Sequence, residues 1–261
     1  MVGKFIVASA VVTILATIGA SFLPIPASWR GTSSEFHIPF IIDTLMACLH
    51  ICAALLFLMT LGAYKQKMRI AYAVVSGGLI LTALGTLQLA VLDGFDLMDS
   101  PWSMSGGVAL PFLLASLAYY AGTRSYGKLV GSTSLFTRAA LVIPVVLLGV
   151  VLFSLLPHVA VPSEIIYDVS NGILVWSLLL DVTAAYIVLR VRQRIGLHYK
   201  QALTWLAVAL LGSSLCLVVA VVQGVVDPNR ESTDYVVNIL ATIAGLLWVR
   251  AGYSFTRTRT Y

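Results

Sequence analysis

The chain has 261 residues, of which 59% are hydrophobic and only 10% are charged, whereas about a quarter of a typical soluble domain is charged. With a mean hydropathy of +0.96, the chain lacks the polar side chains needed to cover a globular surface in water, which excludes a soluble protein and indicates a helical membrane protein. The net charge of +5 comes from basic residues scattered between apolar segments, so no nucleic-acid partner is expected.

Eight apolar segments are long enough to cross about 30 Å of hydrocarbon, which takes roughly 20 residues in a helix. They cover approximately residues 5–24, 38–63, 70–92, 106–121, 138–157, 166–190, 201–224 and 235–255. The fourth is the shortest and contains Pro111, which is tolerated in the first turns of a helix. The sequence therefore predicts an all-α chain, with a seven-helix bundle plus an N-terminal helix forming one transmembrane domain over residues 1–261 and no soluble domain.

The charged residues predict the orientation in the membrane. Every second loop, together with both ends of the chain, holds all the basic residues except Arg30 and Arg230, and the acidic loop residues fall in the other loops. Because Lys and Arg are retained on the cytoplasmic side during insertion, both termini are expected in the cytoplasm and the protein in the cell membrane. Aromatic residues near span ends, such as Tyr126, are expected in the interfacial belt.

The first span has a second interpretation. Lys4, a short apolar core and the small residues Gly19 and Ala20 are also typical of a signal peptide with its cleavage site. Cleavage would leave seven helices without changing the orientation of the rest.

The second span carries two cysteines around a histidine in the sequence CLHIC, residues 48–52. At 100° per residue, Cys48 and Cys52 lie within about 40° of each other, whereas His50 points some 200° away from Cys48. One ion cannot be bound by all three residues, so no metal site is predicted and the cysteines are interpreted as small packing residues. His50 lies at mid-membrane depth with Asp43 two turns earlier on the same face, which is expected to point into the bundle.

Polar residues from several spans recur at a similar depth in the outer half of the membrane. They are Asp43, Gln88, Asp168, Asn171 and Asn238, and the aromatic residue Trp176 is expected to close the site below them. They are either separate interfacial residues that reach water or, with His50 deeper, the lining of a ligand pocket that opens outward.

Asp181 lies slightly to the inner side of the midplane of the sixth span, where an unpaired carboxylate is costly. Its expected partner is Arg250, in a structural ion pair between the sixth and eighth spans. A proton relay between His50 and Asp181 is the alternative.

Known catalytic signatures are absent. No lysine lies inside a span, which excludes a retinal Schiff base, and the sequence has no phosphate-binding, zinc-protease or nucleophile-elbow motif. No cofactor is therefore predicted, and a non-enzymatic role is favoured. Small residues, namely Gly77, Gly78, Ser213 and Ser214, are expected where helices pack closely.

The layout of short-looped helices, with the basic run Arg190-Val-Arg192-Gln-Arg194 before another apolar helix, resembles the membrane sensor regions that precede kinase or cyclase domains in bacteria. It departs from them because no output domain is expected after the last span. The resemblance implies a receptor-like module that binds a small molecule from outside and signals through its basic loops to a cytoplasmic or membrane partner.

Two other functions remain open. One is a small-solute or proton-coupled transporter, and the other is an intramembrane haem or quinone redox protein using His50 and Asp181. Haem between His37 and His158, near the outer surface, is compatible with the second.

Overall fold

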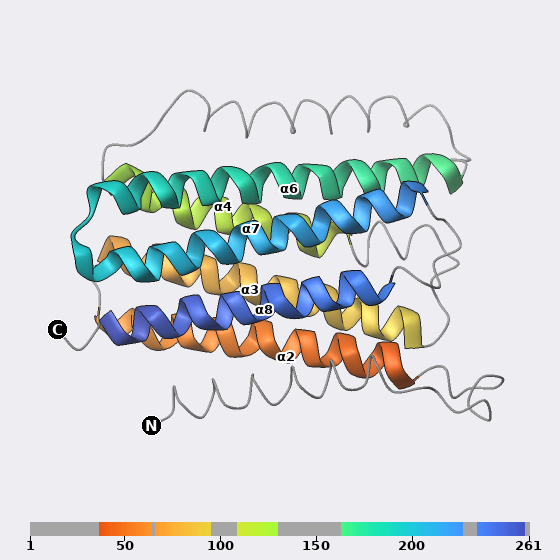
Figure 1. Ribbon diagram of the computed structural model, residues 1–261, viewed down its shortest axis with the longest axis horizontal. Helices are drawn as coiled ribbons and strands as arrows, with labels where there is room; N and C mark the ends of the chain where they lie inside the picture. The colour runs from red at the N-terminus through yellow and green to blue at the C-terminus, as the bar shows by residue number, and fades with distance from the viewer. Residues whose placement is uncertain (1–36, 64–65, 95–108, 130–162, 227–233, 259–261) are drawn as a thin grey trace.

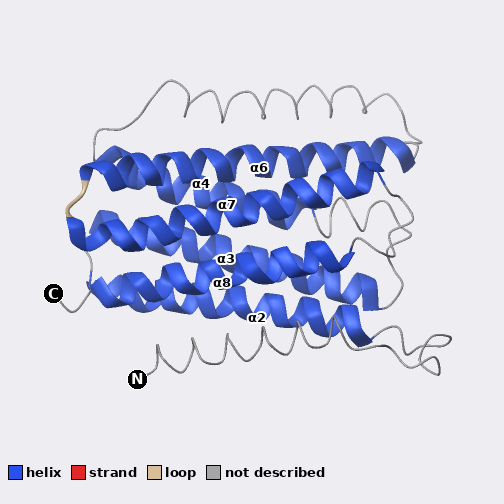
Figure 2. Ribbon diagram, viewed as in Figure 1, coloured by secondary structure: helices blue, strands red, loops and turns tan. Residues whose placement is uncertain are grey.

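The computed structural model describes residues 37–63, 66–94, 109–129, 163–226 and 234–258. These residues form α-helices and one 3-10 turn, with no strand among them (Figure 1, Figure 2). In chain order the helices are α2 (His37–Thr60), α3 (Gln66–Gly94), α4 (Leu110–Leu129), α6 (Ser163–Arg194), α7 (Leu197–Val226) and α8 (Asp234–Arg257). The all-α expectation is confirmed for this part of the chain, and the predicted spans 5–24 and 138–157 lie outside it.

Five of these helices are long and apolar enough to cross a membrane. Their candidate spans are Ile42–Thr60, Met68–Val91, Gly172–Arg194, Tyr199–Val219 and Val236–Arg257. Large apolar side chains lie exposed on the outward faces, and Leu84, Leu179 and Leu215 are each about half exposed. Rows of exposed leucine are unfavourable in water but suited to lipid, so the helices are those of an integral membrane protein.

Helix α4 differs from the span predicted at 106–121. It runs from Leu110 to Leu129, so it begins later and continues about two turns further toward its C-terminal end. Pro111 is its second residue, a position where the missing N–H costs nothing because no carbonyl precedes it in the helix. The last turns contain Arg124 and Lys128, whose charge ended the apolar segment in the sequence although the helix continues.

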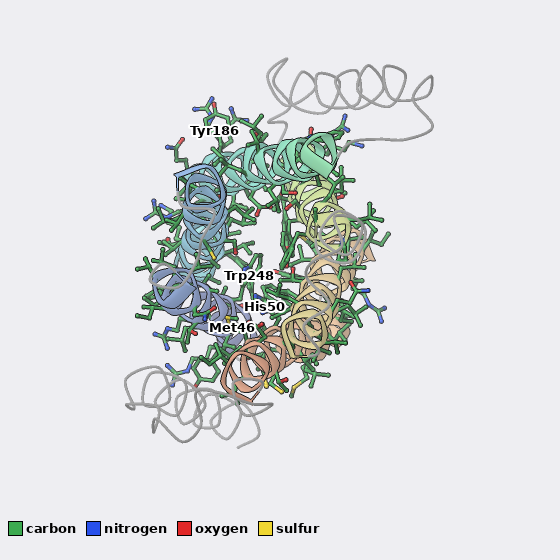
Figure 3. All side chains as sticks on the ribbon, turned by 90° about the vertical axis from the view of Figure 1, so that its right-hand side faces the viewer. Met46, His50, Tyr186 and Trp248 are labelled. Atoms are coloured by element: carbon green, nitrogen blue, oxygen red, sulfur yellow. The ribbon has the colours of Figure 1, made fainter. Side chains whose placement is uncertain are left out.

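The six described helices stand side by side in a closed ring. Contacts join each helix to the next in the order α2, α3, α4, α6, α7 and α8, and α8 packs against α2. Seen along the helix axes, the ring surrounds the side chains of His50 and Trp248, whereas Tyr186 lies outside it (Figure 3). A polar side chain inside this ring therefore has protein around it rather than lipid.

Small residues allow close contact between neighbouring helices. A Cβ atom at Gly78 of α3 would lie 2.6 Å from the Tyr119 ring, and one at Gly252 of α8 would lie 2.8 Å from Leu56. The prediction of a close contact is confirmed at Gly78. It is wrong at Gly77, where a Cβ atom would meet nothing within 4 Å, because the neighbouring residue of a helix points 100° away.

The two ends of the ring differ in charge. The end formed by the link between α6 and α7, here called the basic end, also holds the C-terminal end of α8 (Figure 1). Basic residues lie in the turns nearest this end: Arg69, Arg124, Lys128, Arg190, Arg192, Arg194, Lys200, Arg250 and Arg257. The opposite, acidic end holds Asp93, Glu164, Asp168 and Asp234 at or near helix termini. Basic and acidic segments that alternate along the sequence thus lie at opposite ends of the ring.

The interior also differs between the two halves. Six of the largest fully buried side chains are aromatic: Phe57, Tyr72, Tyr120, Tyr126, Trp248 and Phe255. All six lie within about three turns of the basic end of their helices. The expectation that Tyr126 is interfacial is wrong, because its ring packs edge-on against Tyr72 with centroids 5.5 Å apart. We call these six residues the aromatic cluster.

Candidate functional site

The carboxyl group of Asp181 lies in the middle of α6 and inside the ring. Asp181 is only 2% exposed and shares the inward stripe of its helix with Leu180, Ala184 and Val188. The Ser116 hydroxyl of α4 forms a hydrogen bond with this carboxyl group. Its Oδ1 atom is buried and has no hydrogen-bond partner within the described part of the chain. An unsatisfied buried acceptor costs about 1–3 kcal/mol, so Asp181 is where a hydrogen-bond donor from outside the protein would stabilise the ring most.

A row of side chains crosses the ring beside Asp181. Tyr119 of α4, one turn from Ser116, stacks on Trp248 of α8 with ring centroids 4.6 Å apart. The Tyr119 hydroxyl lies 2.7 Å from Thr82 Oγ1 of α3, and Trp248 Nε1 donates to Ser213 Oγ of α7 at 2.9 Å. Tyr119 is also close enough to Asp181 for an electrostatic interaction. We call Thr82, Tyr119, Trp248 and Ser213 the crossbar. These four residues fix the shape of the ring on one side of the Asp181 carboxyl group.

Trp176 is another buried group with an unused polar atom. It lies on α6 between Asp181 and the acidic end, and its Nε1 has no hydrogen-bond partner among the described residues. Five residues correspond to about 500° of helical rotation, so Trp176 and Asp181 leave the helix in directions about 140° apart. Asp181, which faces the crossbar, is therefore the group on which the candidate site is built.

The structure places His50 away from Asp181. The His50 ring is buried, and its Nδ1 donates to the Met46 carbonyl of its own helix at 2.9 Å. A Cβ atom at Gly245 of α8 would lie 3.8 Å from His50 Cε1, so the imidazole fills the contact between α2 and α8 (Figure 3). The contacts of His50 and Asp181 are made with different helices, and the structure shows no relay between them.

Arg250 also lies apart from Asp181. Its side chain is exposed on the outside of α8, and the guanidinium carbon lies 5.3 Å from the centre of the Trp205 ring on α7. Helix α7 stands between α6 and α8 in the ring. The structure therefore does not bring together the expected ion pair, because Asp181 faces inward and Arg250 faces outward.

Of the residues predicted to line an outer pocket, the structure sets Gln88 apart from Asp43. Asp43 is buried inside the ring and has an interaction partner, and Asn238 is half-buried on α8. Gln88 is exposed on the same outward face of α3 as Leu84, so the structure does not place it with Asp43. Asp168 and Asn171 belong to α6, but the structure does not describe their side chains.

The cysteines also separate. Cys48 is exposed and Cys52 half-buried, while His50 between them is buried. The opposite directions predicted for Cys48 and His50 are thus confirmed. The packing role predicted for Cys48 is wrong, because its side chain faces outward, whereas Cys52 does pack against the core. Within the described ranges, no three His, Cys, Asp or Glu side chains come close enough to share a metal ion.

The sequence did not identify Ser116 as the partner of Asp181, nor the hydroxyl groups of the crossbar. Serine and threonine are common in apolar helices. The hydroxyls of residues such as Ser116, Thr82 and Ser213 can bond to their own backbone and need no further partner. The one signal was that Ser116, Tyr119 and Asp181 occupy similar depths in helices that both run from the acidic to the basic end.

Comparison of the chain with models of protein families, with curated proteins and with solved structures gave no match. The candidate site therefore depends on its own geometry.

Proposed function

We propose that this chain is a multi-pass, receptor-like protein of the cell membrane that binds a small molecule inside its helix ring and signals through its basic end. The observation that carries the proposal is the Asp181 Oδ1 atom, which is buried near the middle of the candidate span Gly172–Arg194 without a hydrogen-bond partner among the described residues. An amine or hydroxyl group of a ligand that donates to this atom removes the cost of leaving it unsatisfied, and an ammonium group adds charge attraction.

The distribution of side-chain size supports entry from the acidic end. The aromatic cluster fills the ring between Asp181 and the basic end. In the acidic half, many buried positions hold small or polar residues: Ala83, Thr86, Ala90, Ala109, Ser214 and Thr242. None of these residues carries an aromatic ring, unlike those of the aromatic cluster. The proposed ligand site lies in this half and replaces the outward pocket predicted from the sequence. Asp181 is the deepest polar group of this site.

Helix α6 supplies a connection from the site to the basic end. It continues without interruption from Asp181 to Arg194 and carries Arg190 and Arg192 in its last turns. Only two residues, Ile195 and Gly196, separate it from α7, and the Tyr199 N–H donates to the Gly196 carbonyl at 3.2 Å at the start of α7. A shift of α6 on ligand binding therefore moves a positively charged link, which suits a signalling partner with an acidic surface.

The charge separation supports the basic end as the cytoplasmic one, with eight helices and both termini inside. Single cysteines introduced into a variant that lacks Cys48, Cys52 and Cys216 test this arrangement. A membrane-impermeant thiol reagent added outside should label a cysteine at Leu97 and not one at Leu129. Labelling at Leu129 alone would reverse the orientation.

A proton-coupled transporter is the second candidate, because intramembrane carboxyl groups are typical of proton pathways. Transporter sites, however, are commonly built on interrupted helices, whereas the six described helices are continuous. Proton-coupled uptake into vesicles that is abolished by Asp181→Asn would favour the transporter. A Soret band in the purified protein would favour the haem protein.

Native mass spectrometry of the purified protein tests the binding proposal. We expect a small molecule to remain bound to the wild-type protein and to the Asp43→Asn variant, and to be lost from Asp181→Asn. The Asp43 variant is a matched control because it makes the same change at the other buried carboxyl group. Equal retention by both variants, or no bound molecule in the wild type, would contradict the proposal.

A further inference from the structure

The outward face of α8 changes from apolar to basic along the helix. Val236, Ile243, Arg250 and Arg257 follow one another at seven-residue intervals and are exposed. Val236 and Ile243 are 48% and 44% exposed, as expected for residues in contact with lipid. Arg250 lies two turns, about 10 Å, before the end of this candidate span. A guanidinium group thus stands on the outward stripe within the candidate span, and contact with lipid there is costly unless the group has a partner.

The neighbouring helices cannot supply a carboxylate to Arg250. The sequence has no Asp or Glu from Val182 to Val226, a range that includes all of α7, and none after Asp234, the first residue of α8. On the other neighbouring helix, α2, the acidic residue is Asp43, which lies near the acidic end. The charge of Arg250 therefore has to be balanced from outside the ring.

Trp205 determines how Arg250 presents its hydrogen bonds. The guanidinium carbon lies 5.3 Å from the centre of the Trp205 ring. A guanidinium group over a ring keeps N–H groups that point away from the ring, and these remain able to bind a second, planar or tetrahedral anion. A tryptophan near the end of a membrane span is also typical of the headgroup region.

The arrangement is repeated nearer the end of the helix. The Arg257 guanidinium lies 5.1 Å from the centre of the Tyr253 ring. Arg250 and Arg257 are seven residues apart and leave α8 in nearly the same direction. The outer surface between α7 and α8 therefore carries two positive charges, each held over an aromatic ring.

We propose that this surface binds the phosphate of an anionic phospholipid in the leaflet at the basic end. Arg250 donates paired N–H groups to the phosphate oxygens, Trp205 holds the guanidinium in place, and the acyl chains lie along the apolar stripe that begins at Ile243. Anionic lipid is the occupant that matches both parts of the surface, since a free phosphate ion has no group for the apolar stripe. The site is separate from the interior ligand of Asp181 and does not depend on it.

Lipid retention measures this site directly. The full chain is reconstituted in nanodiscs that contain phosphatidylglycerol and phosphatidylcholine, and the lipids retained after detergent release are counted by class with native mass spectrometry. We expect the wild type to retain phosphatidylglycerol preferentially and Arg250→Gln to lose about fivefold of this preference, as expected for one basic residue near a membrane surface. Arg250→Lys should fall between them because it keeps the charge but not the paired donors.

Arg190→Gln is the matched control, because Arg190 is also exposed near the basic end but lies on α6, away from the surface between α7 and α8. It should retain the wild-type preference. An equal loss in Arg190→Gln and Arg250→Gln would show a general effect of charge and overturn the site. Displacement of the lipid by excess inorganic phosphate would also overturn it, since the acyl chains would then contribute nothing. Circular dichroism of each variant confirms that the helices are retained.

Discussion

The basic and acidic halves of the ring are built from the same six helices but are filled differently. In the basic half, Phe57 lies within 6.3 Å of the Trp248 ring and 5.6 Å of the Phe255 ring, measured between centroids. In the acidic half, buried residues such as Thr86 and Thr242 bond to the carbonyls of their own helices. Contacts between aromatic rings thus join helices in the basic half, and no such ring contact is found among the described residues of the acidic half. The Asp181 carboxyl group, whose Oδ1 atom has no hydrogen-bond partner among the described residues, lies where the aromatic half begins.

The largest expected effect is on packing in the basic half. Phe57→Ala should lower the free energy of unfolding by about 2–3 kcal/mol. This is less than the loss of about 3–5 kcal/mol in soluble cores, because lipid is as apolar as the helix interior and only the packing contribution remains. Thr86→Ala in the acidic half should cost about 1 kcal/mol or less, since it removes a bond within α3. Both can be measured by unfolding in mixed detergent micelles, and equal losses would remove the distinction between the halves.

The glycine pair of α3 tests the close contact with α4. Gly78→Ala places a methyl group 2.6 Å from the Tyr119 ring and 3.1 Å from the Ala115 carbonyl oxygen, so it should cost about 1–3 kcal/mol of unfolding free energy. Gly77→Ala is the control, because its Cβ atom meets nothing within 4 Å. It should be neutral or stabilise the helix by up to about 1 kcal/mol. The opposite order of thermal midpoints would show that the crossbar is displaced from its described position.

The stability of the protein should fall when Asp181, at the boundary between the halves, loses its hydrogen-bond partner Ser116. Ser116→Ala removes the hydroxyl that bonds to Asp181 and leaves the carboxyl group less satisfied, which should cost about 1–3 kcal/mol. Ser177→Ala is the matched change on α6, where the hydroxyl bonds only to the Ile173 carbonyl of its own helix. It should cost well under half as much. If the two serines gave equal losses, Ser116 would not be supporting Asp181.

The smallest effect is expected for the cysteines of α2. Replacing Cys48 and Cys52 together by Ala should change the free energy of unfolding by less than about 1 kcal/mol, because Cys48 faces outward and Cys52 is only half-buried. Metal content of the purified protein should also be unchanged. Loss of stoichiometric metal in the double variant would show that the interpretation of CLHIC is wrong.

The sequence predicted the helices well because a long apolar run has few other structures available to it in a membrane. It failed at the end of α4 because hydropathy counts the charge of Arg124 and Lys128 but not the backbone hydrogen bonds that continue the helix through them. It also placed Tyr126 at the interface from its distance to the span end, although position along a helix does not determine which way a side chain points.

The candidate site was predicted only in part, and for a related reason. Asp181 was recognised because a carboxyl group within an apolar segment has few explanations. Its partner was taken to be Arg250 on the basis of depth and charge, but depth does not show whether a residue faces the ring or the lipid. Ser116 carried no charge and no motif that could identify it. The order of the helices around the ring, which places α7 between Asp181 and Arg250, became evident only in three dimensions.

An experimental density map of the purified protein in lipid nanodiscs tests the central claim most directly. The proposal predicts non-protein density within hydrogen-bonding distance of Asp181 Oδ1, on the acidic side of the crossbar. Toward the basic end, the aromatic cluster should leave no room for such density. A map in which Asp181 Oδ1 accepts a hydrogen bond from a protein side chain, with no additional density beside it, would contradict a ligand site in the ring.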